Sequence, residues 1–458
     1  MSVTQERFEK MRPVPRGRGP KVTADVLPPG LRVPALVQSV GLLGFRHQFV
    51  PAMKRRYGNV FSLRLLPEGR WLVVFHKPEV VKEIFAGDPA VFHAGKGNAI
   101  LGPVMGEHSL LLVDGATHKR ARKLLMPAFN GHALRGYQEV VTALAKSEVG
   151  TWRAGEEIRS LDRMNALTLE VILQVVFGVT DEQRLAELRP IVNRTVNIHP
   201  LVFLGWGLAR LRNVGPWRRT VENQEHLDRV IYAEIAERRV APDLAERTDV
   251  LSTLLRVRDP ESTTETGGGG GLTDDELRDQ LVTLLLAGHE TTATVLSWAL
   301  YEVGRDPAQL AKARTAALAG DDDYLEAVLK EAMRLHPIIP MVVRTLMQPA
   351  TIGGWDLPKG TTVGPSIIIA HQREDNHEDP EVFRPDRFLG HNPPTNTWIP
   401  FGGGVRRCIG AGFALMEGVA VLREVFAAYD VAAIGDDEPK VRNITSVPRN
   451  GARIRVTR

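Results

Sequence analysis

The sequence predicts a mainly helical protein with small β-sheets, an α+β fold, and three observations support this prediction. Helical patterns of apolar residues run almost continuously from about residue 116 to residue 312, and two more follow at about 324–335 and 411–429. Short apolar runs bounded by turn residues, which are typical of strands, lie outside this helical part. Hydrophobic residues make up 43% of the chain and charged residues 24%, as in an ordinary globular protein.

The first elements in chain order are a hairpin, a helix and a loop. Two apolar runs, 63–66 and 71–75, are separated by the turn residues 67–70, which predicts a β-hairpin. Residues 78–85 have a helical pattern. Residues 92–112 are spaced by glycines and have no clean period, so we expect a long functional loop there.

The remaining elements are mostly helices, with interruptions. A stretch broken by Trp, Gly and Pro interrupts the helical part at 200–217, and a linker with five consecutive glycines interrupts it at 259–271. Strand signals follow at 351–352 and 361–363, and then comes a long Pro-rich segment, 379–400. No internal repeat occurs, so we expect one globular domain over 28–458, preceded by an N-terminal extension, 1–27, that we expect to be flexible.

Cysteine content and charge exclude several classes of protein. The single cysteine cannot form an internal disulfide or a multi-cysteine zinc or iron–sulfur site, and it favours a reducing, cytoplasmic location. The net charge of +4 is small for 458 residues and does not point to nucleic acid. The apolar run 33–44 is shorter than the ~18–20 residues of a membrane span and contains Gln38 and Ser39, so we expect no transmembrane segment.

The cysteine stands in a glycine-rich loop, 401–410, directly before the last predicted helix. A lone cysteine is most often a small buried hydrophobe. Here, however, Gly402, Gly403 and Gly404 would let the backbone approach a flat or bulky group, and a helix N-terminus would stabilise a thiolate. A phosphate-binding loop is excluded, because neither G-x-x-x-x-G-K-[ST] nor a G-x-G-x-x-G after a strand is present.

This loop resembles the haem-binding loop of the cytochrome P450 family, F-x-x-G-x-R-x-C-x-G. The fixed letters match at Phe401, Gly404, Arg406, Cys408 and Gly410. The resemblance implies the cofactor haem b (iron protoporphyrin IX), with Cys408 as the axial thiolate on its iron. Phe401, Arg406 and Gly410 would be further haem-binding residues.

Two more groups of residues match the family. Glu331 and Arg334 form an E-x-x-R pair, which alone would be a surface pair of small energetic value. The resemblance implies that they form a structural group with Arg387 and hold the loop that carries Cys408.

The other group carries positive charge. His118 and Arg122 are four residues apart and share a helix face, which alone would be a solvated basic face beside Lys119, Arg120 and Lys123. The resemblance implies that His118, Arg122, Arg344 and Arg406 contact the haem propionates.

A capping box, Thr273 to Glu276, opens a long apolar helix that contains the polar cluster 287–292. Alone, this cluster would indicate a kinked core helix with satisfied hydroxyls. A zinc site of the H-E-x-x-H type is excluded, because Ala293 stands where the second histidine would be.

The cluster matches the family motif A-G-x-[DE]-T-T at Ala287, Gly288, Glu290, Thr291 and Thr292. The resemblance implies that Ala287 and Gly288 lie against the haem and that Thr291 bonds back to the carbonyl of Ala287, opening a groove for O2 and water. Glu290 and Thr291 would be the catalytic acid–alcohol pair that delivers protons to the bound oxygen.

The resemblance further implies a monooxygenase that inserts one atom of O2 into a C–H bond of a lipophilic small molecule. Fatty acids, terpenoids and steroids all stay open as substrates. We expect the pocket to be lined by 92–112, 200–208, Ala287, 338–343 and 444–447. The stretch 199–206 is open to interpretation as a lid, a membrane-touching tip or buried packing.

Electrons would come from a ferredoxin or flavodoxin with its NAD(P)H-dependent reductase, because the chain has no flavin or iron–sulfur module of its own. We expect Lys119, Arg120, Lys123 and Arg407 to dock that acidic partner by charge complementarity. Two alternatives stay open: a peroxygenase driven by hydrogen peroxide, and a non-enzymatic haem sensor or carrier.

Overall fold

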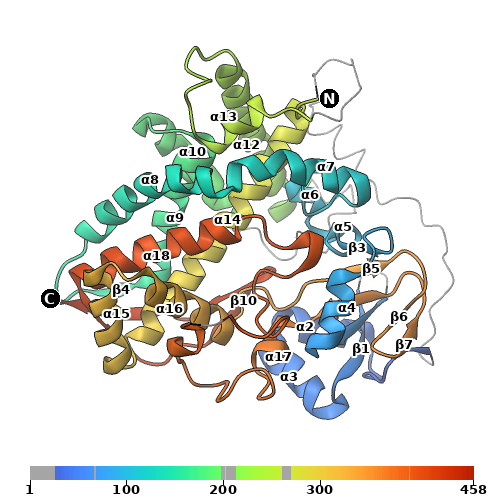
Figure 1. The fold of residues 1–458 in the computed structure, drawn as a ribbon. Helices are drawn as coiled ribbons and strands as arrows, with labels where there is room; N and C mark the ends of the chain where they lie inside the picture. The colour runs from blue at the N-terminus through green and yellow to red at the C-terminus, as the bar shows by residue number, and fades with distance from the viewer. Residues whose placement is uncertain (1–25, 67–68, 197–201, 203–212, 260–269, 391) are drawn as a thin grey trace. The chain divides into compact units, whose positions relative to one another are not determined.

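A computed structural model describes residues 26–66, 69–196, 202, 213–259, 270–390 and 392–458 (Figure 1). The N-terminal extension up to residue 25, most of the stretch 199–212 and most of the glycine linker lie outside the described residues. The described chain forms two compact units, each made of several segments. The first unit holds residues 93–137 and 169–289, and the second holds residues 26–92, 138–168 and 290–458.

The first unit is helical. Its own elements are α5 (Ala94–Gly97), η2 (Ala99–Leu101), α6 (Gly102–Met105), α7 (Gly115–Leu125), η3 (Met126–Phe129), α10 (Glu182–Val196), α12 (Gly215–Arg239) and α13 (Val250–Arg256). Three long helices contain residues of both units: α8 (Gly131–Gly150), α9 (Ser160–Phe177) and α14 (Asp274–Val303).

The second unit combines helices with all of the larger sheets. Its helices are α2 (Ala35–Gly44), α3 (Arg46–Tyr57), α4 (Pro78–Ala86), α15 (Pro307–Ala319), α16 (Asp322–Leu335), α17 (Ile367–His371), η5 (Pro385–Phe388), η6 (Gly404–Arg406) and α18 (Ala411–Ala428). Its strands are β1 (Val60–Leu65), β2 (Arg70–Phe75), β4 (Glu157–Arg159), β5 (Arg344–Leu346), β6 (Ala350–Ile352), β7 (Trp355–Leu357), β8 (Thr362–Pro365), β9 (Asp430–Ala433), β10 (Pro439–Arg442), β11 (Thr445–Pro448) and β12 (Arg453–Thr457).

The largest sheet has the strand order β1-β2-β8-β5-β3, where β3 is Phe92–His93. The predicted hairpin is confirmed, because β1 and β2 pair antiparallel from Val60 opposite Phe75 to Leu65 opposite Arg70. A three-stranded sheet has the order β4-β12-β9, and β6-β7 and β10-β11 form two-stranded sheets.

Strand β2 shows why the largest sheet is stable. Successive side chains of a strand point to opposite faces. Val73 and Phe75 accordingly belong to one buried cluster, which includes Ile84 of α4. Leu72 and Val74 belong to another, with Val50 and Met53 of α3. Helices therefore cover both faces of β2, so it has a continuous apolar run rather than an alternating one.

The predicted fold class is confirmed, but one predicted element is wrong. Residues 92–112 are not a long loop: they contain β3, α5, η2 and α6 in close succession. The glycines separate these short pieces, since Gly106, at φ 87°, has a left-handed conformation directly after α6. The helices α2, α3 and α17 and the strands β9–β12 were not predicted.

Candidate active site

The loop 401–410 presents its cysteine just before a helix. The amide of Cys408 donates to the carbonyl of Phe401 at 2.9 Å, and the amide of Arg407 donates to the carbonyl of Gly404 at 3.1 Å, so the loop is folded tightly on itself. Cys408 is exposed and lies two residues before Gly410, the N-cap of α18. The sulfur is therefore accessible and close to the amide end of a helix, which favours the thiolate.

Two glycines of this loop have a packing role that the sequence did not reveal. A Cβ on Gly404 would lie 2.1 Å from the carbonyl oxygen of Phe85 in α4, and a Cβ on Gly403 would lie 2.2 Å from the Phe85 ring. Gly404 also has φ 65°. Both glycines thus allow the loop to pack against α4 in its own unit.

A buried ionic cluster in the same unit confirms the predicted association of Glu331, Arg334 and Arg387. Glu331 and Arg334 are fully buried in α16, and the Arg334 guanidinium donates to both carboxyl oxygens of Glu331, at 2.7 and 2.9 Å. Arg387 of η5 donates to Glu331 at 3.0 Å. Arg334 also donates to the carbonyls of Pro380 and Val382 at 2.6 and 3.1 Å, so the cluster fixes the Pro-rich segment on α16.

The four expected propionate contacts come from both units. Arg344 is buried on β5 and Arg406 is partly buried at the end of η6, both in the unit of Cys408. His118 is buried and Arg122 is partly buried, one turn apart on α7 in the first unit. Their contact with haem stays a prediction.

The helix α14 has one accessible face. From Leu277 to Val303, every residue is buried except Leu286, Ala287, Gly288 and Thr291. Residues at positions i, i+1 and i+4 lie on one side of a helix. The motif therefore opens a single small window, 287–291, in an otherwise enclosed helix, and a small molecule could approach the helix there.

The helix continues without interruption through this window. The residues from Asp274 to Val303 are helical throughout. Hydroxyls farther along bond back within the helix, since Thr294 donates to the carbonyl of Glu290 at 2.8 Å and Ser297 donates to that of Ala293 at 2.6 Å. Such bonds coexist with helical geometry. The back-bond of Thr291 stays a prediction.

Glu290, directly before Thr291, is buried and has an ionic partner that the sequence did not reveal. The Nε of Arg442 lies 3.0 Å from the Oε1 of Glu290. Burial raises the pKa of Glu290, whereas Arg442 and Thr445 oppose this increase. Arg442 and Thr445 pair with each other across the β10–β11 hairpin, so that hairpin holds the carboxyl in place.

A second buried carboxyl, Glu417 of α18, was also missed. Among the described residues, neither of its carboxyl oxygens has a hydrogen-bond partner of good geometry. Burial raises its pKa to about 8, and the nearby Thr292 side chain offsets only part of that shift. Glu417 of α18 therefore holds a proton near neutral pH, beside Thr292, which directly follows Thr291 in α14.

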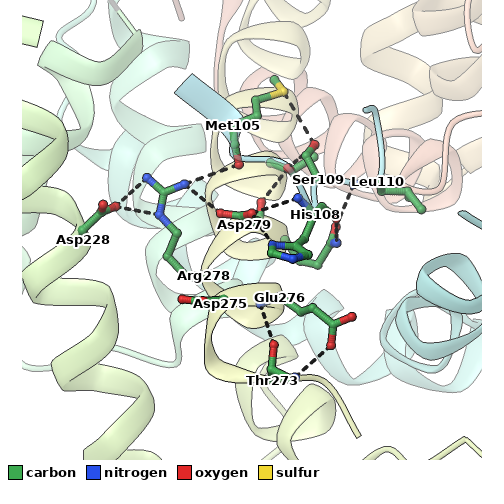
Figure 2. Close-up of polar contacts among 12 residues, drawn as sticks. Met105, His108, Ser109, Leu110, Asp228, Thr273, Asp275, Glu276, Arg278 and Asp279 are labelled. Atoms are coloured by element: carbon green, nitrogen blue, oxygen red, sulfur yellow. Dashed lines mark hydrogen bonds and ion pairs between the residues drawn. The ribbon is translucent and has the colours of Figure 1, made fainter. Parts of the chain in front are cut away.

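The first turns of α14 confirm the predicted capping box (Figure 2). The amide of Glu276 donates to the Thr273 hydroxyl at 3.2 Å, and the amide of Thr273 donates to the Glu276 carboxyl at 2.9 Å. Two residues of the next turn form a buried ionic chain, in which Arg278 bonds Asp228 at 2.6 Å and Asp279 at 3.0 Å.

The same turns fix the segment 105–110. Asp279 accepts from the amide of His108 at 3.0 Å, and the His108 ring nitrogen Nδ1 lies 3.0 Å from the same carboxyl oxygen (Figure 2). This bond raises the pKa of His108. Gln280 accepts from the amide of Leu110 at 3.1 Å. The end of the expected functional loop is thus tied to α14 through its main chain.

Two of the four residues expected to dock an electron donor have internal partners instead. Arg120 bonds Glu276 at 2.7 Å, and Lys123 bonds Asp259 at 3.1 Å. Lys119 and Arg407 are exposed. The Arg407 guanidinium lies 5.8 Å from the centre of the Phe401 ring. Ion pairing therefore neutralises two of the four charges that we expected to contact the electron donor.

Two other findings concern metals and membranes. Among the described residues, no group of three or more His, Cys, Asp and Glu side chains could hold a metal ion. No single described helix is long and apolar enough to cross a membrane, although the bent pair Ser160–Phe177 and Glu182–Thr195 together has sufficient length and composition.

Comparison with known proteins extends over almost the whole chain. The family model "Cytochrome P450" matches residues 27–456. The "Putative cytochrome P450 135A1" of Mycobacterium tuberculosis (strain ATCC 25618 / H37Rv) is 52% identical over 433 residues, covering 94% of this chain and 95% of the relative. The "Putative cytochrome P450 135B1" of Mycobacterium bovis (strain ATCC BAA-935 / AF2122/97) is 41% identical over 438 residues, covering 94% and 91%.

A solved structure shows the same fold. "Retinoic acid bound cyanobacterial CYP120A1" matches with a TM-score of 0.80 and 24% identity, covering 94% of this chain and 99% of that one. The family match and the relatives together show that the chain belongs to the cytochrome P450 family, the haem-thiolate oxidoreductases that incorporate oxygen from O2.

Proposed function

We propose that this protein inserts one atom of O2 into a C–H bond of a lipophilic small molecule, using electrons from a separate redox protein. The main support for this proposal is the accessible window of α14. Between Leu277 and Val303, the only accessible residues are 286–288 and 291. The buried acid Glu290 directly precedes residue 291. A protein that merely binds haem has no need of a carboxyl and a hydroxyl at this position.

The residues present fit a haem. Cys408 offers an accessible thiol near a helix N-terminus, and Arg344 and Arg406 in the same unit offer guanidinium groups suited to carboxylates. We assign Cys408 as the iron ligand, and Arg344, Arg406, His118 and Arg122 as propionate partners. The remaining assigned residues are Phe401 and Gly410, which would shape the loop, and Ala287 and Gly288, which would lie against the ring. When bound, a haem-thiolate centre binds and activates O2.

The protein's own side chains supply the protons. Glu290 titrates under two opposing influences, because burial raises its pKa and Arg442 lowers it. Such a balance suits a group that must both take up and release a proton. Glu290 passes the proton to the neighbouring Thr291 hydroxyl, and Thr291 donates it towards the accessible window.

The composition of the segments expected to line the pocket supports a lipophilic substrate. Ile338 is buried, and Ile339 and Val342 pack against a buried apolar cluster that includes Phe85. Val447 of β11 is buried as well. Apolar walls favour fatty-acid, terpenoid or steroid compounds, whose burial contributes about 25 cal/mol per Å².

We further propose that an acidic ferredoxin or flavodoxin, with its NAD(P)H-dependent reductase, delivers the electrons. The exposed Lys119 and Arg407 support a contact by charge complementarity. Because charges at an interface rim act mainly on the association rate, electron transfer should slow at high ionic strength.

The test is a panel of lipophilic compounds, including retinoic acid, a fatty acid, a terpene and a steroid. Compounds that shift the visible spectrum of the purified holoenzyme are then incubated with NAD(P)H, a ferredoxin and its reductase, or with hydrogen peroxide alone. We expect hydroxylated product in the first reaction, with oxygen derived from O2. Product from peroxide alone would instead show a peroxygenase, and a panel without any spectral shift would favour the haem sensor or carrier.

A further inference from the structure

The helix α2 has its polar and apolar sides reversed relative to an ordinary surface helix. Its polar side chains, Gln38 and Ser39, are buried. Its large apolar side chains point outward: Leu36, Val37, Val40 and Leu43 are each 50–60% exposed. A surface helix of a globular protein normally shows the opposite pattern, with its apolar side turned to the core.

Hydrogen bonds fix this orientation. The amide of Arg64 donates to the Gln38 side-chain oxygen at 2.9 Å, and the amide of Leu66 donates to the Ser39 hydroxyl at 2.9 Å. Gln38 also donates to the carbonyl of Val33 at 2.8 Å. The two polar side chains thereby satisfy main-chain amides at the edge of the largest sheet. Rotating the helix to bury its apolar side would break these bonds and leave the two amides without their partners.

Three more exposed apolar side chains lie near this side of α2 in the chain or through a hydrogen bond. Val33 and Phe45 extend it at either end of the helix, at 40% and 61% exposure, and Leu66 extends it beside Ser39 at 41%. We call these seven residues the α2 apolar surface: Val33, Leu36, Val37, Val40, Leu43, Phe45 and Leu66. Soluble proteins rarely expose so many neighbouring apolar side chains without a partner.

The part of the chain that carries this surface is rich in basic residues. Residues 26–78 contain eight lysines and arginines and a single carboxylate, Glu68. One of the eight, Arg46, is buried; five are exposed, and two, Lys54 and Lys77, are partly buried. The exposed ones are Arg32, Arg55, Arg56, Arg64 and Arg70.

We propose that the α2 apolar surface docks on an anionic lipid surface, with α2 lying in the plane of the membrane. Two observations favour lipid over a protein partner. From Val33 to Phe45, no exposed side chain can donate or accept a hydrogen bond, so the surface lacks the polar groups that specify a protein interface. The excess of basic residues matches the negative headgroups of an anionic leaflet, into which aliphatic side chains insert without needing directional contacts.

Docking of this kind would be reversible. A helix of ten residues does not span a bilayer, so it would lie at the interface. Since charge attraction supplies part of the binding, added salt should weaken it.

The test is flotation of the purified full-length holoenzyme with vesicles. One set of vesicles contains phosphatidylcholine and phosphatidylserine, and the other contains phosphatidylcholine alone. The test variant is Leu36→Asp/Val40→Asp. The matched control is Leu318→Asp on α15, where the leucine is 66% exposed but lies away from α2 in the sequence.

We expect the wild type and the Leu318→Asp control to float with the anionic vesicles and to be released by salt. The double variant should partition into them at least about tenfold less, because two apolar side chains become charged. All three proteins should give the same carbon monoxide spectrum and circular dichroism, which shows that the variants fold.

Three results would overturn the proposal. The wild type could stay in solution with anionic vesicles, or the double variant could float as the wild type does. In the third, the wild type would elute as a dimer and the double variant as a monomer, with no vesicle binding by either. Because flotation does not depend on turnover, none of these results bears on the proposed function.

Discussion

The two parts of α14 use polar side chains for opposite purposes. In the first part, from Thr273 to Thr283, the polar groups are satisfied: Asp279 bonds His108 and Arg278, and Thr283 donates to the Ser109 hydroxyl at 2.7 Å. In the second part, around 287–291, one face is accessible and the buried Glu290 has a single ionic partner outside the helix, among the contacts described above. The type of residue alone therefore does not distinguish a structural polar group from a catalytic one. The two are distinguished by whether the hydrogen bonds of the group are satisfied and whether the helix is accessible there.

The largest expected effect is on stability, and it comes from breaking the buried ion pairs in the first part of α14. Arg278→Ala would leave Asp228 and Asp279 as buried carboxylates without their shared guanidinium, so we expect unfolding to become about 3–5 kcal/mol easier. Denaturant titration of the holoenzyme measures this change. The fraction of electrons that ends in product should stay the same in the folded variant; a selective loss of that fraction with unchanged stability would contradict the structural role.

The next effect concerns Glu417 of α18, whose carboxyl lies near Thr292 in the second part of α14. Its folded-state pKa of about 8 is above the ordinary value of 4.5, so between these values the folded protein holds a proton that the unfolded chain has lost. Stability should therefore fall as pH rises from about 4.5 to about 8. Glu417→Gln removes this dependence and should stabilise the protein by a few kcal/mol at the upper end.

Thermal unfolding of the wild type and of Glu417→Gln across that pH range checks the prediction. Identical slopes for the two proteins would show that Glu417 is not the group that titrates.

The third effect concerns chemistry rather than stability. Thr291→Ala should change unfolding by less than about 1 kcal/mol, because its hydroxyl lies at the accessible window. It should divert most electrons from product to hydrogen peroxide, at least about tenfold above the wild-type ratio, since the proton donor is missing.

The matched control for this substitution is Thr294→Ala, one turn farther along. That hydroxyl is buried and bonds the carbonyl of Glu290. Its loss should cost about 1 kcal/mol of stability and leave product coupling intact. If both variants uncouple to the same extent, the specific role of Thr291 is wrong.

The smallest effect is a shift of a pH profile. Arg442 lowers the pKa of Glu290, so Arg442→Gln should let that pKa rise, and the limb of the product-formation profile due to Glu290 should move to higher pH by up to about one unit. Arg442→Lys keeps the charge and should restore much of the wild-type profile. An unchanged pH profile in Arg442→Gln would show that Glu290 does not deliver protons in the reaction.

The sequence predicted those features that local spacing encodes. The capping box at Thr273 and Glu276 and the Glu331–Arg334 pair depend on residues three apart on a helix, and both are confirmed. Helices α16 and α18 also start and end close to where their patterns place them.

Features that depend on distant partners were not predictable. Nothing near Glu290 in the sequence indicates Arg442, and nothing near Gly404 indicates the Phe85 carbonyl against which it packs. Gln38 and Ser39 looked like interruptions of an apolar run, whereas they anchor α2 to β1. Hydrogen bonds made across the fold decide which side of a helix is buried, and periodicity alone does not reveal them.

The central claim is that the sulfur of Cys408 binds the haem iron. Reduced, fully haem-loaded protein is treated with carbon monoxide, and the spectra of the wild type and Cys408→Ala are compared. The account predicts a thiolate-type spectrum for the wild type and its complete loss in the variant. A thiolate-type spectrum that persists in Cys408→Ala would contradict the assignment.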